Sequence, residues 1–154
     1  MKKEATYVDL LPELSNLLSE SDDPIATLAN ASALIKQSFP LFSWVGFYLL
    51  KKGALVLGPF QGPPACVSIQ VGRGVCGTSF AKKETIVVED VRTFPGHIAC
   101  DSRSLSEIVV PLKKNGAIVG VLDIDSHELA TFDAVDRRYL EMAVAIIADH
   151  LTTV

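Results

Sequence analysis

The sequence predicts a single α/β domain in which a mainly antiparallel sheet is covered by helices. Three observations indicate this fold. Apolar residues recur at helical spacing near both ends of the 154-residue chain, and short β-branched segments occupy its middle. Turn residues join two pairs of these segments into hairpins. Because a hairpin places its two strands antiparallel, most of the sheet should be antiparallel, with the helices packed on it.

Two helices are expected before the first strand. Leucines within residues 7–19 recur at the spacing of a buried helix face. The next helix has Asp22 or Asp23 as its N-cap and Pro24 in its first turn, where the missing N–H of proline is tolerated. It ends at Phe39, because the residue before a proline disfavours helical geometry.

Five strands are predicted, at residues 44–50, 54–57, 85–88, 107–112 and 117–124. Gly53 forms the turn between the first two strands, and Asn115 with Gly116 forms the turn between the last two. A short helix is expected over residues 74–83, and a longer helix over about residues 133–151 ends the pattern. One hairpin therefore lies on each side of an irregular middle.

Two irregular segments between the hairpins are expected to be loops. Residues 58–74 are rich in glycine and proline, and residues 90–106 mix proline, glycine, serine, aspartate and histidine. Cys66 lies in the first segment and Cys100 in the second, while Cys76 lies at the start of the short helix between them. Long loops inside a compact domain are often functional, so the chemistry of the chain is sought here.

Composition and charge exclude several classes of function. The net charge is −4, and lysines and arginines occur in short pairs instead of a stripe, so nucleic acid is not an expected partner. The first residues lack the apolar stretch of a signal peptide, and the apolar runs are too short to cross a bilayer. A cytoplasmic location is expected. An odd number of cysteines there argues against a structural disulfide framework and leaves thiols for chemistry.

The cysteines allow two interpretations. Cysteine is among the most buried residue types, and Cys76, which follows Val75 among small residues, suits inert packing. Cys66 and Cys100 suit nucleophilic or redox chemistry, because loops present reactive groups and a thiolate is a strong nucleophile. His97, three residues before Cys100, either supplies a partial positive charge to that thiol or braces the loop.

Three carboxyl groups are expected at one end of the second hairpin. Asp123 and Asp125 are two residues apart, so a strand places both on one face, and Glu107 begins the neighbouring strand. Such crowding raises the pKa of at least one carboxyl group. A protonated acid can donate to a substrate oxygen, and an ionised one can hold an ammonium group. The alternative is a solvated strand end or a turn cap.

Trp44 and Tyr48 are four residues apart on the first strand and share one face. Core packing explains them, and a wall for a methyl thioether is the functional alternative, because sulfur packs well against aromatic rings. A metal site built from the loop around Cys100 together with Asp123 lacks the paired ligand spacing of zinc sites, so no metal is expected.

Several motifs indicate a family. They read GPFQG at 58–62, GRGVCG at 72–77, FPGHIACD at 94–101, SLSEIVVP at 104–111 and GVLDIDS at 120–126. On these residues the chain resembles the free methionine-(R)-sulfoxide reductases, which are single-domain members of the GAF fold. The resemblance spans roughly residues 44–126 and includes three cysteines at the family's spacing, a set that generic GAF sensor domains lack.

The resemblance implies a fold, an assembly and a reaction. The fold is one GAF domain over residues 1–154, with a six-stranded, mainly antiparallel sheet and helices on both faces, and the assembly is a homodimer. The reaction is the thiol-dependent reduction of free L-methionine (R)-S-oxide to L-methionine. It needs no metal or organic cofactor and uses thioredoxin as the external reductant. The competing interpretation is a non-catalytic GAF sensor of a small molecule.

The resemblance also implies roles for individual residues. Cys100 attacks the sulfoxide sulfur, Cys66 resolves the resulting sulfenic acid as a disulfide, and Cys76 is a third participant. Whether Cys100 or Cys76 is the primary nucleophile stays open. Three acids bind the amino group and protonate the sulfoxide oxygen, namely Glu107, Asp123 and Asp125. The other substrate-binding positions are Trp44 and Tyr48 at the methyl end, and the backbone near Ile98, Ala99 and Cys100.

Overall fold

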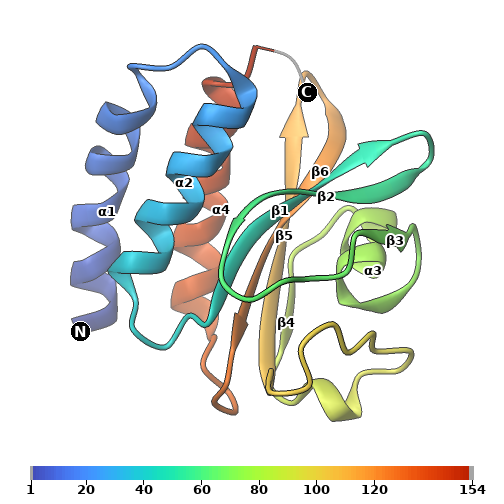
Figure 1. The fold of residues 1–154 in the computed structure, drawn as a ribbon. Coiled ribbons are helices and arrows are strands. Elements are labelled where there is room, and N and C mark those ends of the chain that lie inside the picture. The colour runs from blue at the N-terminus through green and yellow to red at the C-terminus, as the bar shows by residue number, and fades with distance from the viewer. Residues whose placement is uncertain (1, 153–154) are drawn as a thin grey trace.

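The central element of the structure is one antiparallel sheet. The computed structural model describes residues 2–152, and within them six strands lie in the order β3-β2-β1-β6-β5-β4 (Figure 1). The strands are β1 (Trp44–Lys51), β2 (Ala54–Gln61), β3 (Ser68–Gln70), β4 (Ile86–Val88), β5 (Ser106–Lys114) and β6 (Ala117–Ser126). Every neighbouring pair runs antiparallel, which confirms the predicted sheet.

Helices cover both faces of this sheet. On one face lie α1 (Lys2–Leu18), α2 (Pro24–Ser38) and α4 (Ala134–Asp149), where α2 contacts β1 and β2 and α4 contacts β5. The short helix α3 (Gly74–Lys82) packs on the opposite face against β3, β5 and β6, and we call this the α3 face (Figure 1). A 3₁₀ turn at Val91–Thr93 interrupts the second loop. The predicted helices on both faces are confirmed.

The sequence pattern misses one strand and shortens another. The edge strand β3 lies inside the segment 58–74, which is predicted to be a loop, and β2 continues into that segment as far as Gln61. A three-residue strand is too short to show a period. Pro59 is tolerated in β2 because a bulge opposite Phe47 takes it out of the regular ladder. In contrast, the N-cap of α2 is Asp23, whose carboxylate accepts hydrogen bonds from two amides of the first turn.

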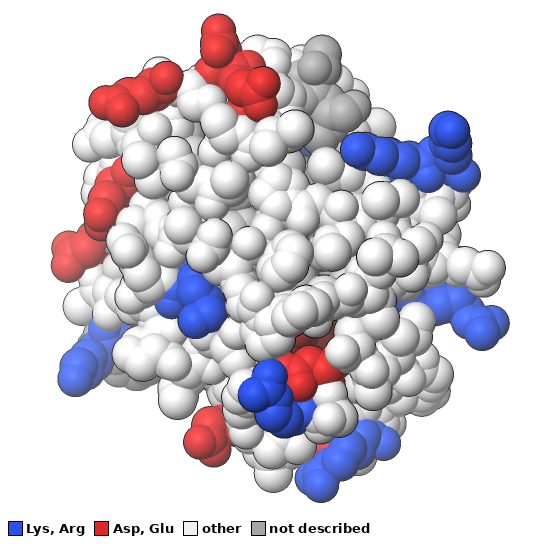
Figure 2. Space-filling view, in the orientation of Figure 1, with Lys and Arg blue, Asp and Glu red and all other residues white. Residues whose placement is uncertain are grey.

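The surface of the described residues carries mixed charges. On the face drawn in Figure 2, lysine and arginine side chains are scattered, and acidic side chains gather mainly at the upper left. This face therefore presents no basic stripe, as the sequence predicts for the chain. Among the helices of residues 2–152, none combines the length and the apolar character that a bilayer span requires.

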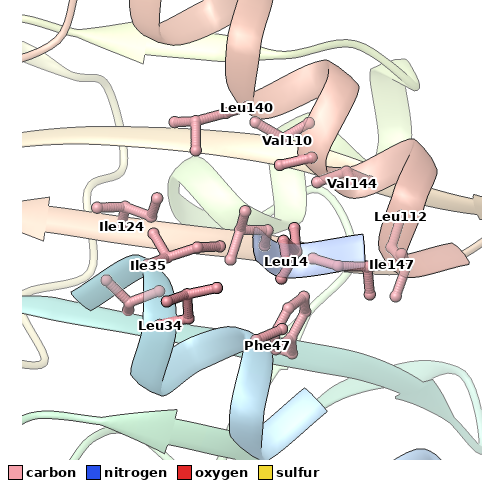
Figure 3. Close-up of a cluster of buried hydrophobic side chains, with 14 of the residues drawn as sticks. Leu14, Leu34, Ile35, Phe47, Val110, Leu112, Ile124, Leu140, Val144 and Ile147 are labelled. Carbon is pink, nitrogen blue, oxygen red and sulfur yellow. The ribbon is translucent and has the colours of Figure 1, made fainter. Parts of the chain in front are cut away.

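A large apolar core lies between the sheet and the helices α1, α2 and α4 (Figure 3). Because side chains alternate along a strand, Phe47, Val110 and Ile124 point from the sheet toward these helices, where they join Ile35 and Leu140. All five side chains are buried. The alternate positions of the same strands contribute to a second, smaller core under α3. This smaller core borders the two long loops.

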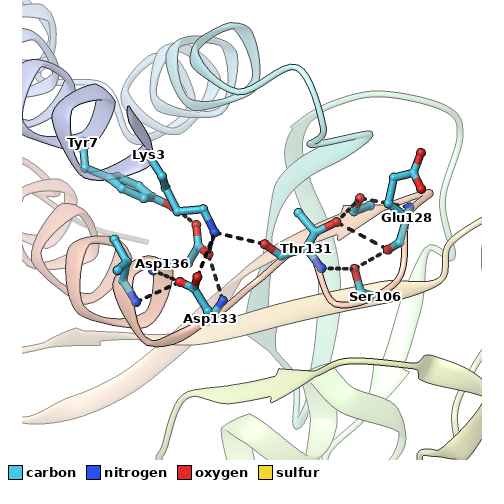
Figure 4. A network of polar contacts seen from close by, with 9 residues as sticks. Lys3, Tyr7, Ser106, Glu128, Thr131, Asp133 and Asp136 are labelled. Atoms are coloured by element: carbon cyan, nitrogen blue, oxygen red, sulfur yellow. Dashed lines mark hydrogen bonds and ion pairs between the residues drawn. The ribbon is translucent and has the colours of Figure 1, made fainter. Parts of the chain in front are cut away.

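A buried polar network ties the first helix to the start of the last (Figure 4). The fully buried carboxylate of Asp136 accepts hydrogen bonds from the Tyr7 hydroxyl at 2.6 Å and from the Lys3 ammonium at 2.7 Å. It also accepts from the Asp133 amide at 2.9 Å, and the two aspartates together form a capping box on α4. Lys3 donates further to the Thr131 carbonyl at 3.1 Å. These donors offset the cost of burying the carboxylate.

Tyr7→Phe should therefore destabilise the fold. The substitution keeps the ring that stacks on Tyr139 but removes one donor from the buried carboxylate of Asp136. We expect the free energy of unfolding to fall by about 1–3 kcal/mol, measured by urea denaturation. Tyr139→Phe is the matched control, because the Tyr139 hydroxyl makes no hydrogen bond within residues 2–152, and it should cost less than about 0.5 kcal/mol. Equal losses in the two variants would contradict this account of the network.

Candidate active site

A small cavity opens on the α3 face, at the end of the sheet where β5 begins and β6 ends. Its volume is about 40 Å³. The wall is formed by β1, by the start of α3 and by both long loops, and the floor is formed by β5 and β6. Figure 2 shows acidic atoms recessed at the base of a hollow in this surface. The two loops predicted to carry chemistry thus meet over one site.

A disulfide between Cys66 and Cys100 joins the two loops. The Cα atoms of these residues lie 5.4 Å apart, although 34 positions separate them in the chain. Both cysteines are half-buried. Cys100 lines the cavity, and Cys66 lies outside its lining. The pairing implied by the family resemblance is therefore present.

Cys76 forms no disulfide within residues 2–152. It lies in the first turn of α3 and lines the same cavity. Its side chain is 3% exposed. A helix N-terminus lowers the pKa of a thiol. Here burial prevails and raises the pKa of Cys76 well above its usual value, and the nearby carboxyl groups of Asp123 and Glu107 add to the shift. Cys76 is thus a protonated thiol beside an acid.

Three carboxyl groups form the floor of the cavity. The register of β5 and β6 places Glu107 opposite Asp125, and the register of β1 and β6 places Gly46 opposite Asp123. All three acidic side chains therefore project from the α3 face. Gly46 leaves space for the Trp44 ring, with which a Cβ atom at this position would collide. The predicted cluster at one end of the hairpin is confirmed.

Burial raises the pKa of all three carboxyl groups. The pKa of Glu107 lies well above its usual value, and repulsion from Asp123 and Asp125 adds to the effect of burial. Burial and the neighbouring Asp123 likewise raise the pKa of Asp125. Burial raises the pKa of Asp123, but hydrogen bonding with Glu107 and Cys76 opposes the rise. Glu107 and Asp125 thus hold their protons more tightly than Asp123, which ionises most readily of the three.

Two polar atoms that border the cavity have no hydrogen-bond partner within residues 2–152. They are Asp123 Oδ1 and Ser104 Oγ, and both residues are buried. A buried polar atom without a partner costs about 1–3 kcal/mol. The cavity is therefore complementary to a ligand that carries hydrogen-bond donors. Sequence reasoning does not identify Ser104, because nothing in its spacing distinguishes it from the other loop serines.

Trp44 and Tyr48 form an aromatic wall of the cavity, with ring centroids 6.1 Å apart. Each ring also holds the first loop through a hydrogen bond. The Trp44 indole N–H donates to the Pro63 carbonyl at 3.0 Å, and the Tyr48 hydroxyl donates to the Cys66 carbonyl at 2.8 Å. The shared face of the two rings follows from their spacing, whereas the bonds to the loop depend on tertiary structure.

The second loop provides the opposite wall. His97 and Ile98 line the cavity, whereas Ala99 is exposed and lies outside the lining. The Cys100 amide donates to the Ile98 carbonyl at 3.2 Å, so in this disulfide form it is not available to a ligand. Burial lowers the pKa of His97, which favours the neutral imidazole and argues against a positive charge beside Cys100.

The floor also contains a potential set of metal ligands. One ligand atom from each of Cys76, Glu107 and Asp123 lies within 4.8 Å of the others. The pKa values of Cys76 and Glu107 are both raised well above the usual range, so a metal ion would have to displace two protons from this set. These three side chains therefore suit a hydrogen-bonded thiol and acid better than a bound metal ion. The absence of a metal stays a prediction.

Comparison with known proteins identifies close relatives. A family profile described as GAF domain matches residues 22–152. GAF domain-containing protein A of Dictyostelium discoideum is 51% identical over 94% of this chain and 92% of that protein. Free methionine-R-sulfoxide reductase of Escherichia coli (strain K12) is 48% identical over 99% of this chain and 93% of that protein. The X-ray structure of the Neisseria meningitidis free methionine-R-sulfoxide reductase in complex with its substrate matches with a TM-score of 0.94 and 48% identity, over 96% of this chain and 89% of that one.

Glu107→Gln should stabilise the protein at neutral and alkaline pH. Carboxyl groups with a raised pKa in the folded state stabilise the fold when protonated, and this contribution is lost as the pH rises from about 4 through the raised values. The amide carries no charge, and its NH₂ group can donate hydrogen bonds in place of the O–H of the protonated acid. We therefore expect a higher melting temperature at pH 8, by about 2–4 °C for each kcal/mol regained, and a shallower fall in stability between pH 5 and pH 8.

The control for this experiment is Glu13→Gln, which changes the same side chain at an exposed position of α1. Its melting temperature should follow that of the unsubstituted protein at every pH. A Glu107→Gln protein that loses stability at pH 8 would show that Glu107 is ionised and paired in the folded state.

Proposed function

This chain belongs to the free methionine-R-sulfoxide reductase family of GAF domains, and we infer that it reduces free methionine (R)-sulfoxide to methionine. The observation that carries this inference is the disulfide between Cys66 and Cys100 above an acidic cavity. A thiol reductase that acts through a sulfenic acid ends each turnover with such a disulfide. A sensor that only binds a small molecule needs no redox-active pair.

The composition of the cavity supports a free amino acid as the substrate. An ammonium group supplies the donors that Asp123 Oδ1 lacks, and the ionised carboxylate offsets its charge. Trp44 and Tyr48 offer an aromatic surface to the methyl and sulfur atoms. Cys66 and Cys100 are paired in this form, so the substrate reacts only after the disulfide is reduced. A methionine sulfoxide residue inside a peptide has no ammonium group and is excluded.

The chemistry proceeds in two steps. The Cys100 thiolate attacks the sulfoxide sulfur while Glu107, which holds a proton, protonates the sulfoxide oxygen. The oxygen is transferred to the Cys100 sulfur, so methionine leaves and Cys100 becomes a sulfenic acid. The Cys66 thiol then attacks that sulfur, which forms the disulfide and releases water. We assign the first attack to Cys100 over Cys76, because burial holds the Cys76 thiol protonated.

An external dithiol must reset the enzyme after each turnover, and we propose thioredoxin for this role. A thiolate of thioredoxin attacks the enzyme disulfide and forms a mixed disulfide. The second thiol of thioredoxin then attacks this intermediate, which leaves both enzyme thiols reduced. The cycle then needs neither a metal nor an organic cofactor. A cytoplasmic location suits this cycle, because thioredoxin is kept reduced there. We also propose a homodimer, on the family resemblance.

Turnover should be confined to one epimer of the free amino acid. With dithiothreitol or thioredoxin as reductant, we expect methionine to form from the R epimer of free methionine sulfoxide, and little or none from the S epimer or from a sulfoxide inside a peptide. Chromatographic assay of methionine from the four substrates measures this preference. Equal activity on the peptide would overturn the argument from the acidic floor.

Cys100→Ser should abolish turnover, because burial holds the Cys76 thiol protonated and Cys66 lies outside the cavity lining. Cys66→Ser should allow about one equivalent of methionine per enzyme and then leave Cys100 as a sulfenic acid, which mass spectrometry detects after trapping. Retained turnover in Cys100→Ser would show that Cys76, and not Cys100, is the primary nucleophile. The sensor alternative makes the opposite prediction, since both serine variants would then bind the ligand as the natural chain does and neither protein would form methionine.

A further inference from the structure

The first loop is attached to the sheet at the point where it carries its cysteine. Three of its carbonyl groups accept hydrogen bonds from the sheet. The Pro63 carbonyl accepts from the Trp44 indole at 3.0 Å, and the Cys66 carbonyl accepts from the Tyr48 hydroxyl at 2.8 Å. The Val67 carbonyl accepts from the Leu57 amide at 3.0 Å. All three donors belong to β1 or β2. The loop is therefore held by its backbone to β1, which forms part of the cavity wall, and to the neighbouring strand β2.

The bond from Tyr48 is the one that acts on the resolving cysteine itself. Its acceptor is the carbonyl group of Cys66, on the same residue as the sulfur that pairs with Cys100. The two Cα atoms stand 5.4 Å apart, within the range of about 4.4–6.8 Å that a disulfide requires. Burial raises the pKa of Tyr48, so its hydroxyl stays protonated and remains a donor. Tyr48 lies in the central strand β1 between β2 and β6, and it is 2% exposed.

We propose that Tyr48 is a positioning residue for the resolving step, because its hydroxyl holds the Cys66 carbonyl where the Cys66 thiol meets the sulfenic acid of Cys100. In that step the sulfur of Cys66 attacks the sulfur of Cys100, the S–O bond breaks, and the hydroxyl group leaves as water with the thiol proton. The hydrogen bond favours the closed disulfide over the open dithiol. This inference rests on the proposed function. It gives a second role to Tyr48, which is also proposed to contact the substrate.

The size of the effect follows from the strength of one hydrogen bond. A single hydrogen bond contributes modestly to a folded arrangement, which corresponds to about a 2- to 10-fold effect on an equilibrium or a rate. Tyr48→Phe removes only the hydroxyl and keeps the ring beside Trp44. Tyr139→Phe is the matched control, since it removes a hydroxyl from another largely buried ring that is distant in sequence from both loops.

The first test measures the disulfide at equilibrium and needs no sulfoxide. The natural chain and the two variants are equilibrated with mixtures of reduced and oxidised glutathione, and the disulfide fraction is read by thiol alkylation and mass spectrometry. Peptide mapping verifies that the counted disulfide joins Cys66 to Cys100. We expect the equilibrium of Tyr48→Phe to shift about 2- to 10-fold toward the dithiol, with Tyr139→Phe unchanged. Equal equilibria in all three proteins overturn the proposal.

The second test separates the two chemical steps. The reduced enzyme is mixed with one equivalent of free methionine (R)-sulfoxide, and methionine formation and disulfide formation are followed separately in quenched samples, with sulfenic acid trapped by dimedone. For Tyr48→Phe we expect the ratio of the disulfide-forming rate to the methionine-forming rate to fall about 2- to 10-fold, with more trapped sulfenic acid on Cys100. An unchanged ratio overturns the role of Tyr48 in resolution. A natural chain that forms no methionine overturns the proposed function alone, and the glutathione equilibrium still decides this inference.

Discussion

The site depends on the burial of three carboxyl groups on one face of the β5–β6 hairpin. No lysine or arginine lines the cavity among the described residues, so protons offset part of the negative charge that counter-ions would otherwise balance. Burial raises the pKa of Glu107, Asp123 and Asp125 together, and the surrounding hydrogen bonds leave Glu107 as the acid and Asp123 as the carboxylate. One group can thus give a proton while its neighbour receives a cation, a division of roles that separate environments give to paired acids.

The opposite face of the sheet fixes this arrangement. Phe47 and Ile124 pack into the core beneath α1, α2 and α4, and Tyr48 and Asp123, their neighbours along the strands, therefore face the cavity. A slip of one residue in β6 would turn Asp123 into the apolar core and Ile124 into the cavity, at a large cost. The network around Asp136 fastens α1 to the start of α4 and so closes that core. Packing on the face covered by α1, α2 and α4 thus determines which side chains face the cavity on the α3 face.

The sequence predicts the acidic floor better than it predicts the loops. The turn at Asn115 and Gly116 predicts the hairpin, and the two-residue period places Asp123 and Asp125 on one face. An irregularity between Leu112 and Lys113 then shifts the pairing by one residue and brings Glu107 opposite Asp125, and this shift is not predicted from the sequence. The approach of Cys66 to Cys100 across 34 positions follows from the family resemblance and not from spacing. Local patterns also omit the strand β3, the unpaired hydroxyl of Ser104 and the anchors of the first loop. Each of these depends on long-range packing, which no short period encodes.

The three cysteines lie in different environments, and these environments suit them to different roles. Cys76 lies on a helix against the acidic floor, where burial and the carboxyl groups keep its thiol protonated. Cys66 and Cys100 lie on loops, where the backbone can adjust between an open dithiol and a closed disulfide. A cavity that stays rigid for binding and a pair of sulfur atoms that changes partner at every turnover make conflicting demands on one structure. The fold meets both because the sheet holds the acids and rings in place, while its hydrogen bonds to loop carbonyls guide the sulfur atoms that must move.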